Sequence, residues 1–252
     1  MSITPTKKSG LQTVGSCTRN WPKSTCGLVF EGGQDHDQII TTRKGTGGFN
    51  LKVTGVGAHA GNQHADGVNA IHALSLLVPR LEALTDYDEG TTVNVGVIHG
   101  GTSKNTVPEE ANCSIDVRIT SQDCADQVVN ALKEIASNPF TDFENLPSKF
   151  AQVKVELTGA IRRPPMESSE ASEALRASYE NFASLEGLDI GRAPLQGGGS
   201  DANLLAAKGV PCIDGLGPYG KFMHSPKEWS SLSSLKQRTK ALAGFLVNAQ
   251  GI

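Results

Sequence analysis

Residues 111–119 read ANCSIDVRI, a run in which small or apolar residues alternate with polar and charged ones. This alternation predicts a β-strand with one buried and one exposed face. Around it we expect, in chain order, a strand at 49–56, a helix at 66–84, a strand at 91–98, a helix at 121–136 and a strand at 153–157. The resulting β-α-β-β-α-β order predicts a ferredoxin-like sandwich over residues 49–159.

The sequence before this sandwich contains two further predicted strands, at 27–31 and 38–43. The glycine-rich run at 45–48 is expected to be a hinge or turn. Residues 1–25 show neither helical nor strand periodicity, so we expect a tail there.

Helices alternate with apolar strands after the sandwich, which is typical of an α/β layer. In chain order we expect a helix at 168–185, a helix opened by the glycine-rich run 197–201, a strand at 210–213 and a helix at 231–248. The prediction is therefore one α/β domain, made of residues 26–48 and 160–252, that is interrupted by a ferredoxin-like insert.

Composition excludes several classes of protein. Among the 252 residues 38% are hydrophobic and 19% are charged, which is ordinary for a globular chain, and the formal net charge of -3 argues against nucleic-acid binding. No block of Lys and Arg suggests a membrane surface, and no apolar run is long enough to cross a membrane. The five cysteines form no C-x-x-C pair, which favours a reducing compartment and therefore the cytoplasm.

Three residues stand where catalytic or metal-binding groups are often found. Glu31 ends the first predicted strand, and α/β sheets place functional groups at the carboxyl ends of their strands. His224 follows a Gly- and Pro-rich loop, and carboxylates and imidazoles both bind zinc. His59 lies between small residues in GAHAG, where an exposed imidazole can donate a hydrogen bond to an oxyanion. Taken singly, each is also compatible with an ordinary surface residue.

Three further polar residues could hold an anionic substrate. Asn105 is one candidate, together with Arg118 at the end of a strand and Arg163 before two prolines at the predicted domain junction. Guanidinium groups bind carboxylates bidentately, although solvated surface arginines are more common. The run at 197–201 resembles a phosphate-binding loop but lacks the Lys of a P-loop, which disfavours a nucleotide site.

Together and in this order, several motifs resemble the two-zinc glutamate carboxypeptidase, aminoacylase and acetylornithine deacetylase family. The resemblance covers residues 26–252 and rests on the motifs GLVFEGG, GAHAG, GVNAIHAL, GGTSKNTVPEEANCSIDVR, RRPP, GGGSDANLLAAKGVPCIDGLGP and MHS. It implies a zinc-peptidase-like α/β domain interrupted by a ferredoxin-like lid that forms a homodimer. It also implies hydrolysis of an amide bond in an N-acyl amino acid or peptide.

The resemblance implies a role for each candidate residue. Glu31 and His224 correspond to a carboxylate ligand of one zinc ion and a histidine ligand of the other. His59 resembles a lid histidine that polarises the scissile carbonyl in the partner subunit. The groups that resemble those holding the substrate's carboxylate are Asn105, Arg118, Arg163 and the backbone of Gly198 and Gly199.

The chain departs from the family pattern before Glu31. The family carries a His-x-Asp motif, a bridging Asp and a Glu-Glu pair in this region, whereas residues 1–30 contain no His, Asp or Glu. The expectation is a truncated, incomplete catalytic domain that is inactive alone, because two ligands do not retain two zinc ions. The alternative is a non-catalytic dimerisation or carboxylate-binding module.

Overall fold

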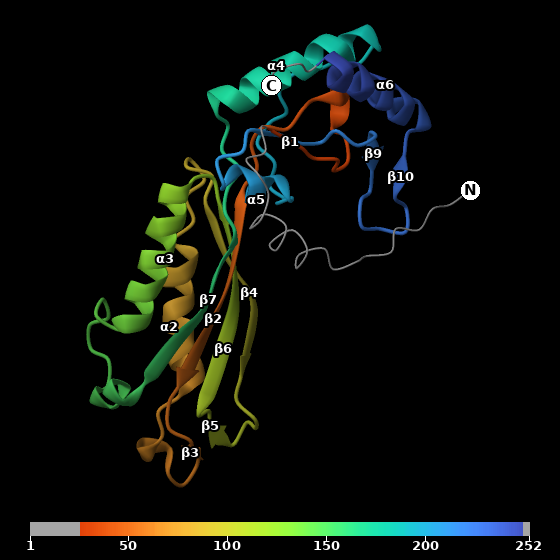
Figure 1. Cartoon of the computed structure of the whole chain (residues 1–252). Helices are drawn as coiled ribbons and strands as arrows, with labels where there is room; N and C mark the ends of the chain where they lie inside the picture. The colour runs from red at the N-terminus through yellow and green to blue at the C-terminus, as the bar shows by residue number, and fades with distance from the viewer. Residues whose placement is uncertain (1–25, 249–252) are drawn as a thin grey trace. The chain divides into compact units, whose positions relative to one another are not determined.

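The chain contains two compact units in the computed structural model, which describes residues 26–248 (Figure 1). Unit 1 comprises residues 26–43 and 166–248 within that range, and unit 2 comprises residues 44–165. The division lies a few residues outside the 49–159 range expected for the insert. The tail expected at residues 1–25 lies outside the described residues.

Unit 2 is built on a four-stranded antiparallel sheet. Its strands are β2 (Gly45–Thr54), β4 (Thr92–Gly100), β6 (Glu110–Ile119) and β7 (Lys154–Arg163), arranged in the order β4-β6-β2-β7. The structure confirms the alternation predicted for β6, because Cys113, Ile115 and Val117 are buried and the residues between them are more exposed.

Two helices, α2 (Ala70–Glu82) and α3 (Gln122–Ser137), pack on one face of this sheet (Figure 1). Each begins with a side-chain cap, in which Asn69 or Ser121 accepts a hydrogen bond from a backbone N–H of the first turn. Apolar residues from both helices and all four strands form one core, so the unit has the sandwich that the order of elements predicted.

The prediction of a hinge at 45–48 was wrong, because these residues form the first part of β2. A side chain on Gly45 would come within 2.8 Å of the Arg163 carbonyl oxygen, and one on Gly47 would come within 2.8 Å of Ile161 Cδ1. The glycines therefore permit close packing of β2 against β7. Strand β7 is longer than predicted, since Gly159, with a φ of 114°, breaks the regular alternation without ending the strand.

Unit 1 has a short parallel pair, β1 (Gly27–Leu28) with β8 (Cys212–Ile213). Three helices, α4 (Glu170–Leu185), α5 (Ala202–Ala206) and α6 (Leu232–Asn248), belong to this unit. A hairpin of β9 (Gly220–Lys221) and β10 (Trp229–Ser230) completes it. The strand expected at 38–43 is reduced to isolated bridges at Ile39, Ile40 and Arg43.

Two small cores hold unit 1 together. One joins α4 and α6 to the strands through Tyr179, Ile213 and Phe245, and the other lies around Met166, Ala202 and Cys212. Within residues 26–248, no helix combines the length and apolar character that crossing a membrane requires.

Candidate functional site

Glu31 is exposed and follows β1, at the carboxyl end of the parallel pair. Backbone hydrogen bonds bind its loop to the loop after β8, with Gly217 N donating to the Glu31 carbonyl at 2.9 Å and Gly33 N donating to Pro218 O at 3.0 Å. A side chain on Gly217 would lie 2.6 Å from the Glu31 carbonyl oxygen, so only glycine allows this approach.

His224 is exposed in the loop of the β9–β10 hairpin. Its φ of 64° is left-handed, a conformation that non-glycine residues rarely adopt, and its backbone N–H donates to Glu228 Oε2 at 3.0 Å. The neighbouring Met223 lies against the Glu31 loop, because a side chain on Gly32 would meet Met223 Cε at 2.1 Å. The structure thus brings together the loops of Glu31 and His224, which are distant in sequence.

These two residues do not make a metal site by themselves. Among the described residues, no three His, Cys, Asp or Glu side chains are grouped so that they could hold a metal ion. Burial, reinforced by the charges of Cys26 and Asp214, raises the pKa of the nearby Cys212 thiol to about 12, so no thiolate is available there at neutral pH. The groups present therefore do not fit a pair of zinc ions, each of which needs three or four ligands.

His59 lies at one end of unit 2, in β3 (Ala58–His59), which pairs with β5 (Thr106–Val107). Its Nδ1 accepts hydrogen bonds from the backbone N–H groups of Gly61 and Asn62, each at 3.1 Å. An imidazole nitrogen that accepts a hydrogen bond carries no proton, so neutral His59 holds its proton on Nε2. The exposed side chain is therefore set up as a hydrogen-bond donor.

Asn105 adjoins His59, since its carbonyl accepts a hydrogen bond from Ala60 N at 2.9 Å. Its side-chain Oδ1 accepts from Ser103 Oγ at 2.7 Å. A hollow of about 530 Å³, lined by Ala60, His64 and residues 100–104 and 106–108 among others, lies in the same part of the unit. Two of the predicted functional groups are therefore neighbours.

Arg118 and Arg163 lie on the four-stranded sheet, away from the small β3–β5 sheet that carries His59, and both are paired in register with Thr46 of β2. Arg118 Nε and Nη2 bind the two oxygens of Asp116 at 2.8 and 3.2 Å. Arg118 stands eight positions after Glu110, the first residue of β6, which at 3.4 Å per residue is about 27 Å. The structure thus divides the predicted substrate-binding groups of unit 2 into two clusters.

Gly198 and Gly199 belong to a loop held by a buried network that the sequence did not reveal. Arg43 donates to the Asp214 carboxylate at 2.6 Å and to the Gly198 carbonyl at 2.9 Å. Asp214, which is 0% exposed, also accepts from Ser200 Oγ at 2.5 Å. A side chain on Gly198 would meet no described atom within 4 Å, so the backbone of this loop is open to an approaching group.

A second ion-pair network fixes the segment that carries Arg43. Thr41 and Ser168 hydroxyls donate to Glu173 Oε1 at 2.8 and 2.6 Å, and Arg176 Nε donates to Oε2 at 2.7 Å. Burial alone would raise the pKa of the Glu173 carboxyl, but the hydrogen bonds from Ser168, Arg176 and Thr41 outweigh it and lower the pKa to about 2. The sequence does not reveal the long-range contacts of either network, because 171 positions separate Arg43 from Asp214 and 132 separate Thr41 from Glu173.

Comparison with known proteins finds relatives of this chain in sequence and in structure. Residues 41–144 match the family model of the M20 peptidase dimerisation domain. In this range the chain is similar to the M20 peptidases. Carboxypeptidase G2 from Pseudomonas sp. strain RS-16 is 29% identical over 225 residues, which are 88% of this chain and 52% of that protein. The indole-3-acetyl-aspartic acid hydrolase of Enterobacter agglomerans is 29% identical over 74% of this chain and 40% of its own length.

Solved structures of peptidases share this fold. Aminopeptidase PepT from Bacillus cereus aligns with a TM-score of 0.75 at 22% identity, over 94% of this chain and 60% of that one. A Bacillus subtilis protein described as a dinuclear metal-binding peptidase of the M20 family aligns with a TM-score of 0.62 at 16% identity, over 88% of this chain and 56% of that one. The chain thus spans about 40–60% of the length of these relatives, and residues 41–144 resemble a peptidase dimerisation domain.

Proposed function

We propose that this chain supplies the dimerisation unit and part of the metal-binding unit of a metal-dependent amide hydrolase of the M20 type. The observation that carries the proposal is the contact between the loops of Glu31 and His224 at the carboxyl end of β1 and β8. A carboxylate and an imidazole suit zinc, which we propose as the metal. The remaining ligands would have to come from outside the described residues, and for this reason we expect residues 26–248 alone to be inactive.

The proposed substrate is an N-acyl amino acid or peptide with a free carboxylate. Relatives of the chain are named for hydrolysing indole-3-acetyl-aspartic acid and p-aminobenzoyl-glutamate, both amides of acidic amino acids. Asn105, Arg118 and Arg163 are the side chains proposed to hold the carboxylate, with help from the open backbone at Gly198 and from the neighbouring Gly199. Arginine suits this role because its planar fork matches both carboxylate oxygens.

The proposed partner is a second copy of the chain, bound through unit 2. Strand β4 lies at one edge of the sheet, and its Val97 and Ile98 side chains are 47% and 54% exposed. Ile71 of α2 is 40% exposed and lies next to Gly100 at the end of β4, where an added side chain would come within 2.7 Å of it. An apolar strand edge of this kind is suited to pairing with another chain. His59 would then act in the site of the partner.

We also propose a cytoplasmic location, which suits the free thiols of Cys26 and Cys113.

A second candidate is a non-catalytic module that dimerises and binds a carboxylate. It is favoured by the absence of any three-ligand group among the described residues. Zinc analysis of the purified chain separates the two candidates. About two tightly held ions per chain would favour a complete enzyme, whereas the structure leads us to expect neither bound zinc nor hydrolysis of N-acyl amino acids when zinc is added.

The hydrolase proposal can be tested with a chimera in which the N-terminal part of carboxypeptidase G2 precedes residue 26. The chimera is expected to hydrolyse a glutamyl amide, and Glu31→Ala or His224→Ala is expected to lower both zinc content and rate. His59→Ala is expected to lower the rate by about 10²–10³ with unchanged zinc content, while His64→Ala on the same loop serves as the control. Mixing His59→Ala with His224→Ala chimeras should restore part of the activity, because each mixed dimer contains one intact composite site. Mixed dimers without recovery would show that His59 does not act across the interface.

A further inference from the structure

The outer edge of β7 is open. The strand order β4-β6-β2-β7 leaves β7 with one strand neighbour among the described residues. Proteins commonly protect such an edge with charged side chains. Charges stand at both ends of β7, at Lys154 and Glu156 and at Arg162 and Arg163, but the five residues LTGAI at 157–161 carry none. The middle of the edge is therefore unprotected.

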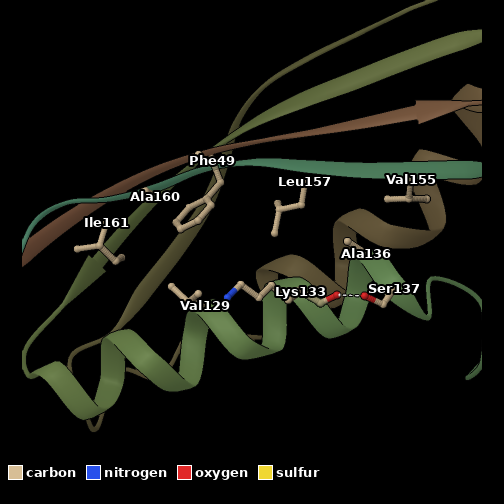
Figure 2. A pocket seen from close by; sticks show the side chains of 10 residues that line it. Phe49, Val129, Lys133, Ala136, Ser137, Val155, Leu157, Ala160 and Ile161 are labelled. Atoms are coloured by element: carbon tan, nitrogen blue, oxygen red, sulfur yellow. Dashed lines mark hydrogen bonds between the residues drawn. The ribbon is translucent and has the colours of Figure 1, made fainter.

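An apolar groove opens beside this uncharged stretch, between β7 and α3 (Figure 2). Its volume is about 540 Å³. The sheet contributes Phe49, Val155, Leu157, Gly159, Ala160 and Ile161, and the helix contributes Val129, Lys133, Ala136 and Ser137. Gly159 carries no side chain and Ala160 carries a small one, so this part of the groove wall presents mostly backbone.

Lys133 supplies the only positive charge in the lining of this groove. Figure 2 shows its side chain running along the α3 wall toward Val129. The backbone carbonyl of Lys133 accepts a hydrogen bond from Ser137 Oγ at 2.9 Å, but within residues 26–248 no carboxylate lies in ion-pair contact with the ammonium group. A cation at the side of an apolar groove suits a ligand that is apolar apart from one carboxylate.

We propose that β7 and α3 form a docking site for an extended peptide segment of another protein, with alternating apolar side chains and one acidic side chain. The peptide adds a strand to the edge at 157–161, which satisfies the open backbone groups. Its alternate side chains enter the groove, and its carboxylate pairs with Lys133. A second copy of this chain is the competing occupant, because its β7 carries one carboxylate, Glu156, beside three cationic residues, Lys154, Arg162 and Arg163, that would face the same charges of the first copy.

Fluorescence anisotropy with the full chain tests this proposal. The probe is a fluorescein-labelled, C-terminally amidated peptide of sequence Val-Thr-Val-Thr-Glu-Thr, in which the valines and the glutamate face the same side of the strand. We expect saturable binding, with shifts in the amide NMR signals of β7 and not of β4. Replacing the probe's glutamate with glutamine should weaken binding about two- to fivefold, as expected for one partly exposed ion pair. Methylating the backbone nitrogens that face β7 should abolish binding.

A charge exchange separates this contact from a loss of folding. Lys133→Glu should weaken binding of the glutamate probe and strengthen binding of a probe with lysine at that position. Lys208 is an exposed lysine of unit 1, and Lys208→Glu should change the affinity for neither probe. Any of three binding results would overturn the proposal: no saturable binding, equal affinity for the glutamate and lysine probes, or binding that is insensitive to backbone methylation. Self-association of the chain that Lys133→Glu changes, with no peptide binding, would likewise overturn it in favour of a second copy.

Discussion

The buried pair of Arg43 and Asp214 permits a quantitative prediction. Arg43 is 7% exposed and makes two hydrogen bonds, one to a carboxylate and one to the Gly198 carbonyl. Arg43→Met removes both and leaves the fully buried Asp214 carboxylate with Ser200 and the Gly215 N–H as its remaining donors. Hydrogen bonds to charged groups contribute about 1.5–3 kcal/mol each, and breaking a buried ion pair costs about 3–5 kcal/mol. We therefore expect unit 1 to lose about 3–5 kcal/mol of unfolding free energy.

Urea unfolding followed by tryptophan fluorescence measures this loss in the right unit. Trp229 belongs to unit 1, and the measurement is made in a Trp21→Phe background so that the emission comes from Trp229 alone. Arg192→Met is the matched control, because that side chain is 50% exposed and its nearest carboxylate oxygen, on Glu173, lies 3.4 Å away. An exposed pair contributes about 0–1 kcal/mol.

The double variant Arg43→Met with Asp214→Asn gives a second measure of the same interaction. Because both partners of one ion pair are changed, the combined loss should be smaller than the sum of the two single losses. A loss for Arg43→Met that stays within about 1 kcal/mol of the Arg192→Met control, or strictly additive losses in the double variant, would refute the reasoning.

Three further predictions concern other parts of the chain. Long-range ¹H–¹⁵N NMR should find the proton of neutral His59 on Nε2, and a proton on Nδ1 would contradict the observed hydrogen bonds. A carboxyl whose pKa falls on folding stabilises the fold above its unfolded pKa, so the stability that Glu173 contributes should fade as pH falls from about 4.5 to about 2. The difference in urea midpoint between wild type and Glu173→Gln should therefore shrink over that pH range. A difference that stays constant would contradict this prediction. Ile98→Lys on the β4 edge should shift sedimentation toward the monomer, whereas Thr158→Lys on the β7 edge should not, and equal effects would argue against a β4 interface.

The sandwich of unit 2 could be predicted because its signals are local. Alternation along β6 and helical spacing along α2 depend on neighbouring residues only, so they survive without tertiary information. The run at 45–48 was misjudged because glycine suits both a turn and a closely packed strand, and only the proximity of Ile161 and Arg163 distinguishes them.

The candidate site could be predicted only in part, because its ligands and supports come from distant segments. Glu31 and His224 were found through motifs, yet nothing local indicates that Gly32 and Met223 bring their loops into contact. Arg43 and Asp214 were missed altogether, since 171 residues separate them and a single Arg or Asp beside an apolar strand is commonplace. Buried polar networks of this kind become visible only when burial and partners are both known.

The two clusters on unit 2 bear directly on the proposal of a composite site. His59 and Asn105 lie at the small β3–β5 sheet, near the Glu110 end of β6, whereas Arg118 lies about 27 Å further along β6. Two fully extended residues span only about 7 Å, so one small substrate cannot contact both ends of the same unit. In a symmetric dimer each end has a counterpart on the partner, and a twofold axis repeats every contact reciprocally. If both clusters act on one substrate, they must therefore belong to different subunits, which makes dimer formation a condition for catalysis.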